Sequence, residues 1–258
     1  MNPAHEAPVV GEPILWEKLP LQRLPHVVVL VGLALSLLIY SITLQSLEKR
    51  QRAYFDFRAR EAAALIDNRM RAYQQVLRGV SGLYETRQTV SRADFRTFVE
   101  HQNLSEHFPG IQAVAFAQVL APERLAEHTA ELRREGFPLY EVKPAGSRPL
   151  YSAIVYIEPF SGRNLRAFGY DMYSEPVRRQ AMDRAVDTGH MALSGKVRLQ
   201  QETGADEQAG FLIYKAVFRQ ETAHRTPEQR REQLLGWVYA PFRMNDFMRG
   251  LLGEQAQD

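Results

Sequence analysis

Residues 27–45 read VVVLVGLALSLLIYSITLQ, a run of 19 residues without a charged side chain. As an α-helix this run is about 28 Å long, which matches the roughly 30 Å hydrocarbon core of a bilayer. A cleaved signal peptide has a shorter apolar region, of about 7–15 residues, that ends at a small-residue cleavage site. This run instead continues directly into Ser46-Leu47-Glu48-Lys49-Arg50. The stretch is therefore predicted to be a retained transmembrane helix.

The charges that flank the apolar run do not decide its orientation. Lys18 and Arg23 precede it, whereas Lys49, Arg50 and Arg52 follow it. The positive-inside rule is weak for a difference of one residue, and large domains cross the membrane largely regardless of flanking charge. Both orientations stay open at this point.

The segment after the apolar run is predicted to be a long helix, because residues 45–84 contain no proline and no glycine before Gly79. Apolar residues recur in it at alternating spacings of four and three, forming a seam of Ile66, Met70, Tyr73, Leu77, Val80 and Tyr84. Such a seam either pairs with another subunit or packs on the protein's own domain as a stalk. An amphipathic helix that simply covers a core would show the same pattern.

The rest of the chain mixes strand-like and helix-like segments without regular alternation. Helices are predicted to begin at Ser91, at Pro122 and near Glu175, and a last helix near Met244. Strands are predicted at residues 111–120, 139–143, 151–159, 191–200, 210–218 and 236–242. This order favours an α+β fold, with a mostly antiparallel sheet of about five strands and helices on its faces, as in PAS-like sensors.

The sequence contains no recognisable catalytic, metal or cofactor motif. It has no cysteine, which excludes disulfides and thiol catalysis, and its net charge of +2 gives no indication of nucleic acid as a partner. No phosphate-binding, dinucleotide-binding or zinc-protease motif occurs, and no two histidines are four apart. Asp183 and Asp187 interleave with Arg178, Arg179 and Arg184, and this group is predicted to be a solvated helix face. No enzymatic activity, metal or cofactor is expected.

Binding is the remaining class of function. Glu158 ends a strand of almost entirely apolar residues, so its carboxylate could accept hydrogen bonds from a ligand in an apolar pocket. A solvent-facing strand end, or a partner for a nearby arginine, would explain it equally well. Phe211 and Tyr214 should point to opposite faces of their strand, whereas Tyr214 and Phe218 share a face that is either core or pocket.

Several short stretches together resemble the CHASE domain, the extracellular sensory domain of bacterial and plant histidine kinases, adenylate cyclases and diguanylate cyclases. They occur in the family's order over about residues 75–250. The stretches are FPGI at 108–111, VYIEP at 155–159 with Asn164, FGYDMYS at 168–174, AVDTG at 185–189, ALSG at 192–195 with Val197, Leu199 and Gln200, GFL at 210–212, GWV at 236–238 and FRMND at 242–246.

The resemblance implies an N-terminal transmembrane helix, a long stalk helix that forms a homodimer, and two PAS-like subdomains outside the cell's inner membrane, in the periplasm. The expected organisation is a cytoplasmic tail at 1–25, a transmembrane helix at 26–45, a stalk at 46–90, the sensor at 91–250 and a polar end at 251–258. Family members continue into a second transmembrane helix and an output domain, such as a histidine kinase or nucleotide cyclase. This chain is therefore expected to be a fragment or a truncated form of a longer receptor.

The resemblance also implies a site for a small molecule. Plant members bind cytokinins, and the aspartate that meets the adenine aligns with Glu158, which is one methylene longer. Leu193 aligns with a leucine that lines the plant pocket. A purine-like or other metabolite is the expected ligand, and the expected ligand-binding residues are Phe116, Tyr156, Glu158, Leu193, Ser194, Tyr214 and Phe218. A protein–protein interaction module without a small-molecule ligand remains the alternative.

Overall fold

The computed structural model describes residues 24–108, 110–204, 206–219 and 226–253. The chain divides into two compact units, one up to Glu61 and one from Ala62 onward. The predicted tail at 1–25 and polar end at 251–258 lie mostly outside the described residues. The described helices are α1 (Leu24–Thr86), α2 (Arg92–Glu100), α3 (Leu104–His107), α4 (Leu125–Arg134), α5 (Pro176–Thr188), α6 (Pro227–Glu232) and α7 (Met244–Leu252), with short 3₁₀ turns η3 (Pro122–Arg124), η4 (Gly162–Ala167) and η5 (Met172–Ser174).

The predicted membrane span and stalk form one continuous helix, α1. Its apolar window has a mean hydropathy of 2.6 and no buried residue, and by length and composition α1 can cross a membrane. Exposed aliphatic side chains fill the window, as expected for a surface that lipid covers. The long apolar N-terminal helix is thus confirmed.

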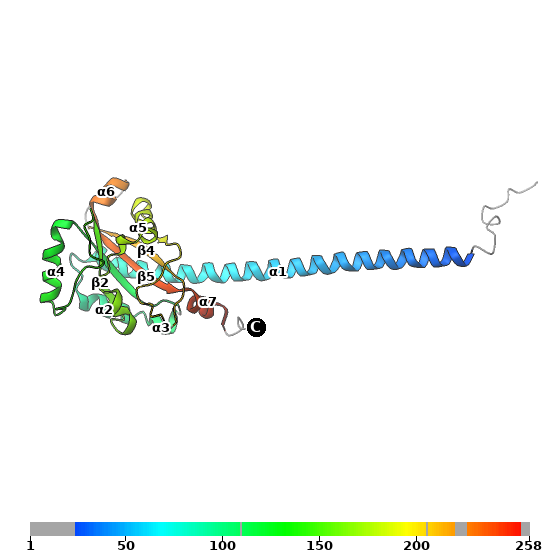
Figure 1. Ribbon diagram of the computed structural model, residues 1–258, viewed down its shortest axis with the longest axis horizontal. Coiled ribbons are helices and arrows are strands. Elements are labelled where there is room, and N and C mark those ends of the chain that lie inside the picture. The colour runs from blue at the N-terminus through cyan, green and yellow to red at the C-terminus, as the bar shows by residue number, and fades with distance from the viewer. Residues whose placement is uncertain (1–23, 109, 205, 220–225, 254–258) are drawn as a thin grey trace, which may run out of the picture. The chain divides into compact units, whose positions relative to one another are not determined.

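In the part of the chain that the structure describes, five strands form a single antiparallel sheet in the order β2-β1-β5-β4-β3. The strands are β1 (Val114–Leu120), β2 (Tyr151–Glu158), β3 (Ala192–Leu193), β4 (Gly210–Phe218) and β5 (Leu234–Arg243) (Figure 1). Every neighbouring pair is antiparallel, which confirms the predicted mixed fold.

Three details of the predicted fold differ from the structure. The resemblance implied two PAS-like subdomains, whereas the described residues contain one sheet, because the segments around β2 fold into helices and turns. The strand predicted at residues 139–143 makes only an isolated bridge from Lys143 to Tyr170. The strand predicted at 191–200 is limited to Ala192–Leu193, and beyond it Val197 forms an isolated bridge to Gly210 of β4.

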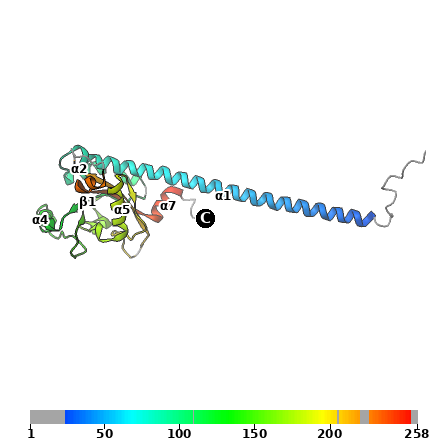
Figure 2. The ribbon, with the colours of Figure 1, turned by 90° about the horizontal axis from the view of Figure 1, so that it is seen from above.

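Helices cover both faces of the sheet. One face packs against α1 and α2, through a cluster that includes Phe95, Phe116 and Val238. The other face packs against α5 (Figure 2). The cluster on that face includes Tyr214 and Trp237. The two clusters alternate along β4 and β5, as side chains of successive strand residues must.

The apolar seam of the stalk is buried against the sheet of its own chain. Tyr73, Leu77, Val80 and Tyr84 all belong to the cluster beneath α1. Of the alternatives left open by the sequence, the structure therefore favours a helix that packs on its own domain. A contact with a second subunit must use other surfaces of α1.

The first and last helices of the second unit contact each other. The Tyr73 ring lies 6.1 Å from the Phe247 ring of α7, measured between centroids. Arg69 also donates a hydrogen bond of 3.3 Å from Nη2 to the carbonyl of Gly250. Helix α7 thus returns the chain to the side of α1.

Candidate ligand-binding face

Helix α5 carries one charged residue toward the sheet. Its start is fixed by Glu175, whose carboxylate accepts hydrogen bonds from the backbone N–H groups of Val177 (3.0 Å) and Arg178 (2.9 Å). At helical spacing from Arg178, residues Ala181, Met182 and Ala185 are buried in the cluster beneath α5. The small alanines allow a close approach to the sheet, so Arg178 is only 2% exposed.

The guanidinium of Arg178 is held by neutral oxygens. Nη1 donates to the hydroxyl of Tyr170 (2.9 Å) and Nη2 donates to the carbonyl of Arg198 (2.6 Å). The guanidinium also lies 5.1 Å from the centre of the Tyr170 ring. Its Nε is buried and has no hydrogen-bond partner among the described residues. Within the same described part of the chain, Arg178 forms no ion pair with an aspartate or glutamate.

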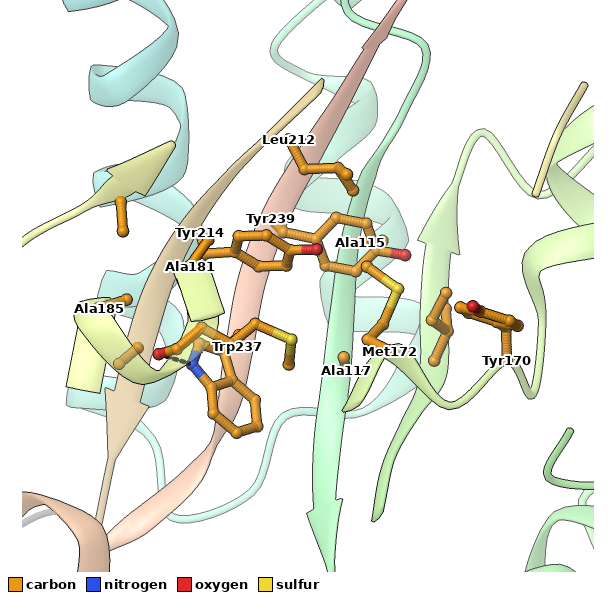
Figure 3. Close-up of a cluster of buried hydrophobic side chains, with 14 of the residues drawn as sticks. Ala115, Ala117, Tyr170, Met172, Ala181, Ala185, Leu212, Tyr214, Trp237 and Tyr239 are labelled. Atoms are coloured by element: carbon orange, nitrogen blue, oxygen red, sulfur yellow. Dashed lines mark hydrogen bonds between the residues drawn. The ribbon is translucent and has the colours of Figure 1, made fainter. Parts of the chain in front are cut away.

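Two tyrosines of the sheet face the same layer. Tyr214 of β4 and Tyr239 of β5 are register partners, and their ring centroids lie 5.7 Å apart. Both side chains are fully buried, and neither hydroxyl finds a hydrogen-bond partner in the part of the chain that is described. Figure 3 shows both hydroxyls pointing in the same direction across the sheet, toward the side where Met172 and Tyr170 lie.

The electrostatics of this layer link the two tyrosines to Arg178. Burial raises the pKa of both Tyr214 and Tyr239, so both phenols are neutral hydrogen-bond donors at physiological pH. The charge of Arg178 acts in the opposite direction on the pKa of each of them. The three unpartnered polar atoms therefore belong to one electrostatic neighbourhood.

A loop held by Asp171 forms one wall of this layer. One carboxylate oxygen of Asp171 accepts hydrogen bonds from the backbone N–H groups of Ser152 (2.8 Å) and Tyr173 (3.1 Å). The other lies 3.4 Å from Arg148. Burial raises the pKa of Asp171, and its hydrogen bonds with the backbone oppose that rise. Tyr170 and Met172 are thereby fixed against the sheet.

The seven residues expected to bind a ligand do not converge on one place. Tyr214 and Phe218 lie on the α5 face, which confirms that they share a face. Phe116 and Tyr156 lie on the opposite face, where the Phe116 ring stacks on Tyr84 at 4.4 Å. The Phe116 and Tyr156 rings lie 6.3 Å apart, so the structure brings these four aromatic residues together as two separate pairs, one on each face of the sheet.

The other three expected residues contact the protein itself or solvent. One oxygen of the Glu158 carboxylate accepts a hydrogen bond from Arg96 Nε (3.3 Å), and the other from the backbone of Phe160 (2.9 Å). Ser194 uses its hydroxyl to accept from the N–H of Leu212 (2.9 Å), and Leu193 is 47% exposed. Their binding role stays a prediction.

Sequence reasoning missed Arg178, Tyr170 and Tyr239. It assigned Arg178 to a solvated face, which is wrong, because that side chain is buried under α5. The spacing of Arg178 to Ala181, Met182 and Ala185 would have indicated this, since all four residues lie on one helix stripe.

A cavity of about 510 Å³ opens at the edge of the same layer. It lies where β1 ends, and its lining includes His128 of α4 together with Tyr173, Asp183 and Val186 from the region of α5. The Tyr173 hydroxyl donates to the Asp183 carboxylate at this edge. None of the seven expected residues lines the cavity.

Comparison with known proteins gives one family. The sequence profile described as the CHASE domain matches residues 88–258. No curated protein matches the chain. One similar solved structure is the ligand-binding domain of the Pseudomonas aeruginosa PAO1 amino acid chemoreceptor PctC in complex with GABA, at 10% identity and a TM-score of 0.42, covering 74% of this chain and 62% of that one. Another is the periplasmic sensory domain of the Campylobacter jejuni chemoreceptor Tlp1, at 11% identity and a TM-score of 0.44, covering 77% of this chain and 62% of that one.

Proposed function

The chain belongs to the CHASE family of extracellular sensory domains, and from that premise we propose that it binds a small molecule between α5 and the sheet. The proposal places the second unit in the periplasm and α1 in the inner membrane as its anchor. It further holds that binding is reported through α1, in a homodimer, to an output domain.

The observation that carries this proposal is the set of unpartnered polar atoms beneath α5. Buried donors and acceptors in native proteins are almost always satisfied, and each exception costs about 1–3 kcal/mol. Here Arg178 Nε and the hydroxyls of Tyr214 and Tyr239, all on one face, lack hydrogen-bond partners within the described ranges of the chain. A group from outside the protein would satisfy all three.

The sheet offers a physical route from this face to the stalk. Tyr239 faces α5, whereas its neighbours Val238 and Ala240 pack in the cluster beneath α1. Farther along β5, the Phe242 ring lies 4.8 Å from Tyr73 of α1, measured between centroids. A ligand that shifts β5 would therefore change the contacts of α1, provided that its affinity differs between the two arrangements.

The test is thermal unfolding of the full chain in lipid nanodiscs against a metabolite library that includes purines. We expect at least one compound to raise the melting temperature, with the shift lost in Tyr239→Phe. Leu193→Trp and Glu158→Ala serve as comparison variants. Loss of the shift in these two, with Tyr239→Phe unaffected, would move the ligand to the site implied by the plant relatives. A library without any hit would contradict the proposal.

An interaction module without a small-molecule ligand is the alternative function. The observation that favours it is the dense packing of the α5 face, which the chain's own side chains occupy. Under this alternative, the melting temperature stays unchanged with every compound, while disulfide trapping of α1 in membranes still yields dimers.

A further inference from the structure

We infer that the ligand of this face is a small organic acid with one carboxylate, which Arg178, Tyr214 and Tyr239 hold together. The inference rests on the proposed function, because it names the chemical class of that same ligand. It requires that the three residues supply both a positive charge and hydrogen-bond donors.

Among the described residues, no carboxylate forms an ion pair with Arg178. Its Nη atoms donate to a phenol and to a carbonyl, both of which are neutral. Burying a charge without a counter-charge is strongly unfavourable, because the protein interior replaces only part of its hydration. A bound anion would neutralise this buried charge, and it would be attracted to the guanidinium of Arg178.

Two nearby carboxylates are committed elsewhere. Glu175 uses both of its oxygens to accept from backbone N–H groups at the start of α5. Asp171 accepts from the backbone of Ser152 and Tyr173 through one oxygen. Its other oxygen has no hydrogen-bond partner among the described residues, but it lies 3.4 Å from Arg148, with which Asp171 forms an ion pair. Glu175 does influence the phenol of Tyr214 electrostatically, so it is the internal alternative to a bound anion.

The free atoms determine the kind of anion. Arg178 Nε–H and two neutral phenol O–H groups are all donors, and a carboxylate is an acceptor with about four lone-pair positions. An ammonium group would be repelled by the positive charge of Arg178. A phosphate dianion would exceed the single charge of Arg178 and leave a buried negative charge. One carboxylate matches both the charge and the donors.

The surroundings limit the rest of the ligand to a small apolar body. Leu212, Met172 and Trp237 belong to the same buried cluster as the two tyrosines. Trp237 already donates its indole N–H to the carbonyl of Met182 (3.1 Å), so it offers the ligand only apolar surface. A short aliphatic acid would therefore gain apolar contacts in addition to its charge.

The experiment uses the fluorescence of Trp237 in the full chain. The sequence has two tryptophans, so a Trp16→Phe background in nanodiscs leaves Trp237 as the reporter. Acetate, propionate and butyrate are titrated beside acetamide, propionamide and butyramide, and inorganic phosphate serves as a second anion. We expect saturable changes with the carboxylates and none with the uncharged amides or with phosphate.

Variants test the three residues separately. Tyr214→Phe and Tyr239→Phe remove one donor each and should each weaken carboxylate binding about 10-fold or more, the usual effect of losing a hydrogen bond to a charged group. Arg178→Gln should abolish binding, and Arg178→Lys should retain part of it. The matched control is Tyr140→Phe, which removes a buried hydroxyl that is bonded to His128 and should leave the affinity unchanged. If Arg178→Gln does not fold, Tyr214→Phe and Tyr239→Phe still test whether the carboxylate binds at this site.

Three results would overturn the inference. Equal binding of amides and carboxylates would mean that the ligand's charge is not recognised. Unchanged binding in Tyr214→Phe and Tyr239→Phe would mean that the ligand does not contact these two tyrosines. Absence of carboxylate binding, with Glu175→Gln alone destabilising the protein, would make Glu175 the counter-charge. If another library compound still raises the melting temperature of the wild-type chain, the sensor function survives this failure. If no compound does, both proposals fail.

Discussion

At the scale of single residues, the layer between α5 and the sheet contains buried polar groups without hydrogen-bond partners among the described residues. Each such group destabilises the ligand-free protein. Tyr239 differs from Phe only by a hydroxyl that is buried and has no partner among the described residues. Removal of an unsatisfied buried group relieves its desolvation penalty. The same substitution that weakens ligand binding should therefore stabilise the free protein.

We predict that Tyr239→Phe raises the free energy of unfolding of the ligand-free chain by about 1 kcal/mol. Tyr140→Phe should lower it by about the same amount, because its hydroxyl pairs with His128 Nε2 at 2.9 Å. Urea denaturation of both variants beside the wild type measures the difference. Destabilisation by both variants to the same extent would mean that Tyr239 has a partner in the free protein.

His128 gives the stability a dependence on pH. Burial lowers the pKa of its imidazole from 6.5 to about 4. Between these values the unfolded chain binds a proton that the folded chain does not, so stability falls as the pH drops through this window and is complete above it. The loss should be about 2 kcal/mol between about pH 7 and about pH 4.5. In His128→Gln the denaturation midpoint should change less over this interval, whereas an identical pH dependence would contradict the assignment.

At the scale of elements, Gly236 allows β5 to approach β1 closely. It adopts a φ of 155°, and a Cβ added there would overlap the carbonyl oxygen of Ala117 and crowd the Phe116 ring. Since β5 occupies the centre of the sheet, this contact affects the pairing on which both faces depend.

We predict that Gly236→Ala destabilises the protein by more than about 2 kcal/mol. Gly82 of α1 is the matched control, because a Cβ there meets no atom within 4 Å outside its own helix. Gly82→Ala should stabilise the chain by about 0.5–1 kcal/mol through its higher helix propensity. Thermal unfolding of both variants checks the contrast, and a similar effect of the two would contradict it.

The sequence predicted those elements that a local pattern determines. The helix predicted to begin at Ser91 is present as α2, with Ser91 as its N-cap, and the strands β1, β2, β4 and β5 are present as well. What it did not predict depends on contacts between distant segments. The assignment of Glu158 and Leu193 to a ligand site stays a prediction that rests in part on likeness to plant relatives. The burial of Arg178 depends on α5 packing against β4. The apolar seam of α1 also did not reveal what it packs against, because packing on its own sheet and packing on another subunit require the same apolar side chains.

At the scale of the whole molecule, the use of that seam within one chain limits how two chains meet. Leu77 is buried against its own sheet, whereas Phe55 of the first unit is 71% exposed and Tyr54 beside it is exposed as well. A dimer through α1 is expected to use such exposed apolar side chains.

We predict that oxidation of membranes carrying Phe55→Cys yields disulfide-linked dimers, and that Leu77→Cys yields none. The natural chain has no cysteine, so each variant reports on a single position. Gel electrophoresis without reductant detects the product. Efficient cross-linking at Leu77 would mean that the seam leaves its own sheet, and no cross-linking at any exposed position of α1 would contradict dimerisation through this helix.

The absence of cysteine also allows the topology to be tested. Leu139 is 91% exposed in the second unit, so Leu139→Cys should react with a membrane-impermeant maleimide added to spheroplasts. A cysteine at Ala4, before the apolar run, should react only after the membrane is permeabilised. The reverse pattern of labelling would place the sensor unit in the cytoplasm.

The hydrogen bond between Arg69 and Gly250 holds the first and last helices of the second unit together. Because the backbone enters and leaves the second unit at neighbouring points, this unit could be spliced as a cassette into a surface loop of a host protein without stretching the host. Inserted into a fluorescent protein, it would transfer any relative movement of α1 and α7 directly to the chromophore's surroundings. The module would then serve as an optical reporter for whatever metabolite it recognises.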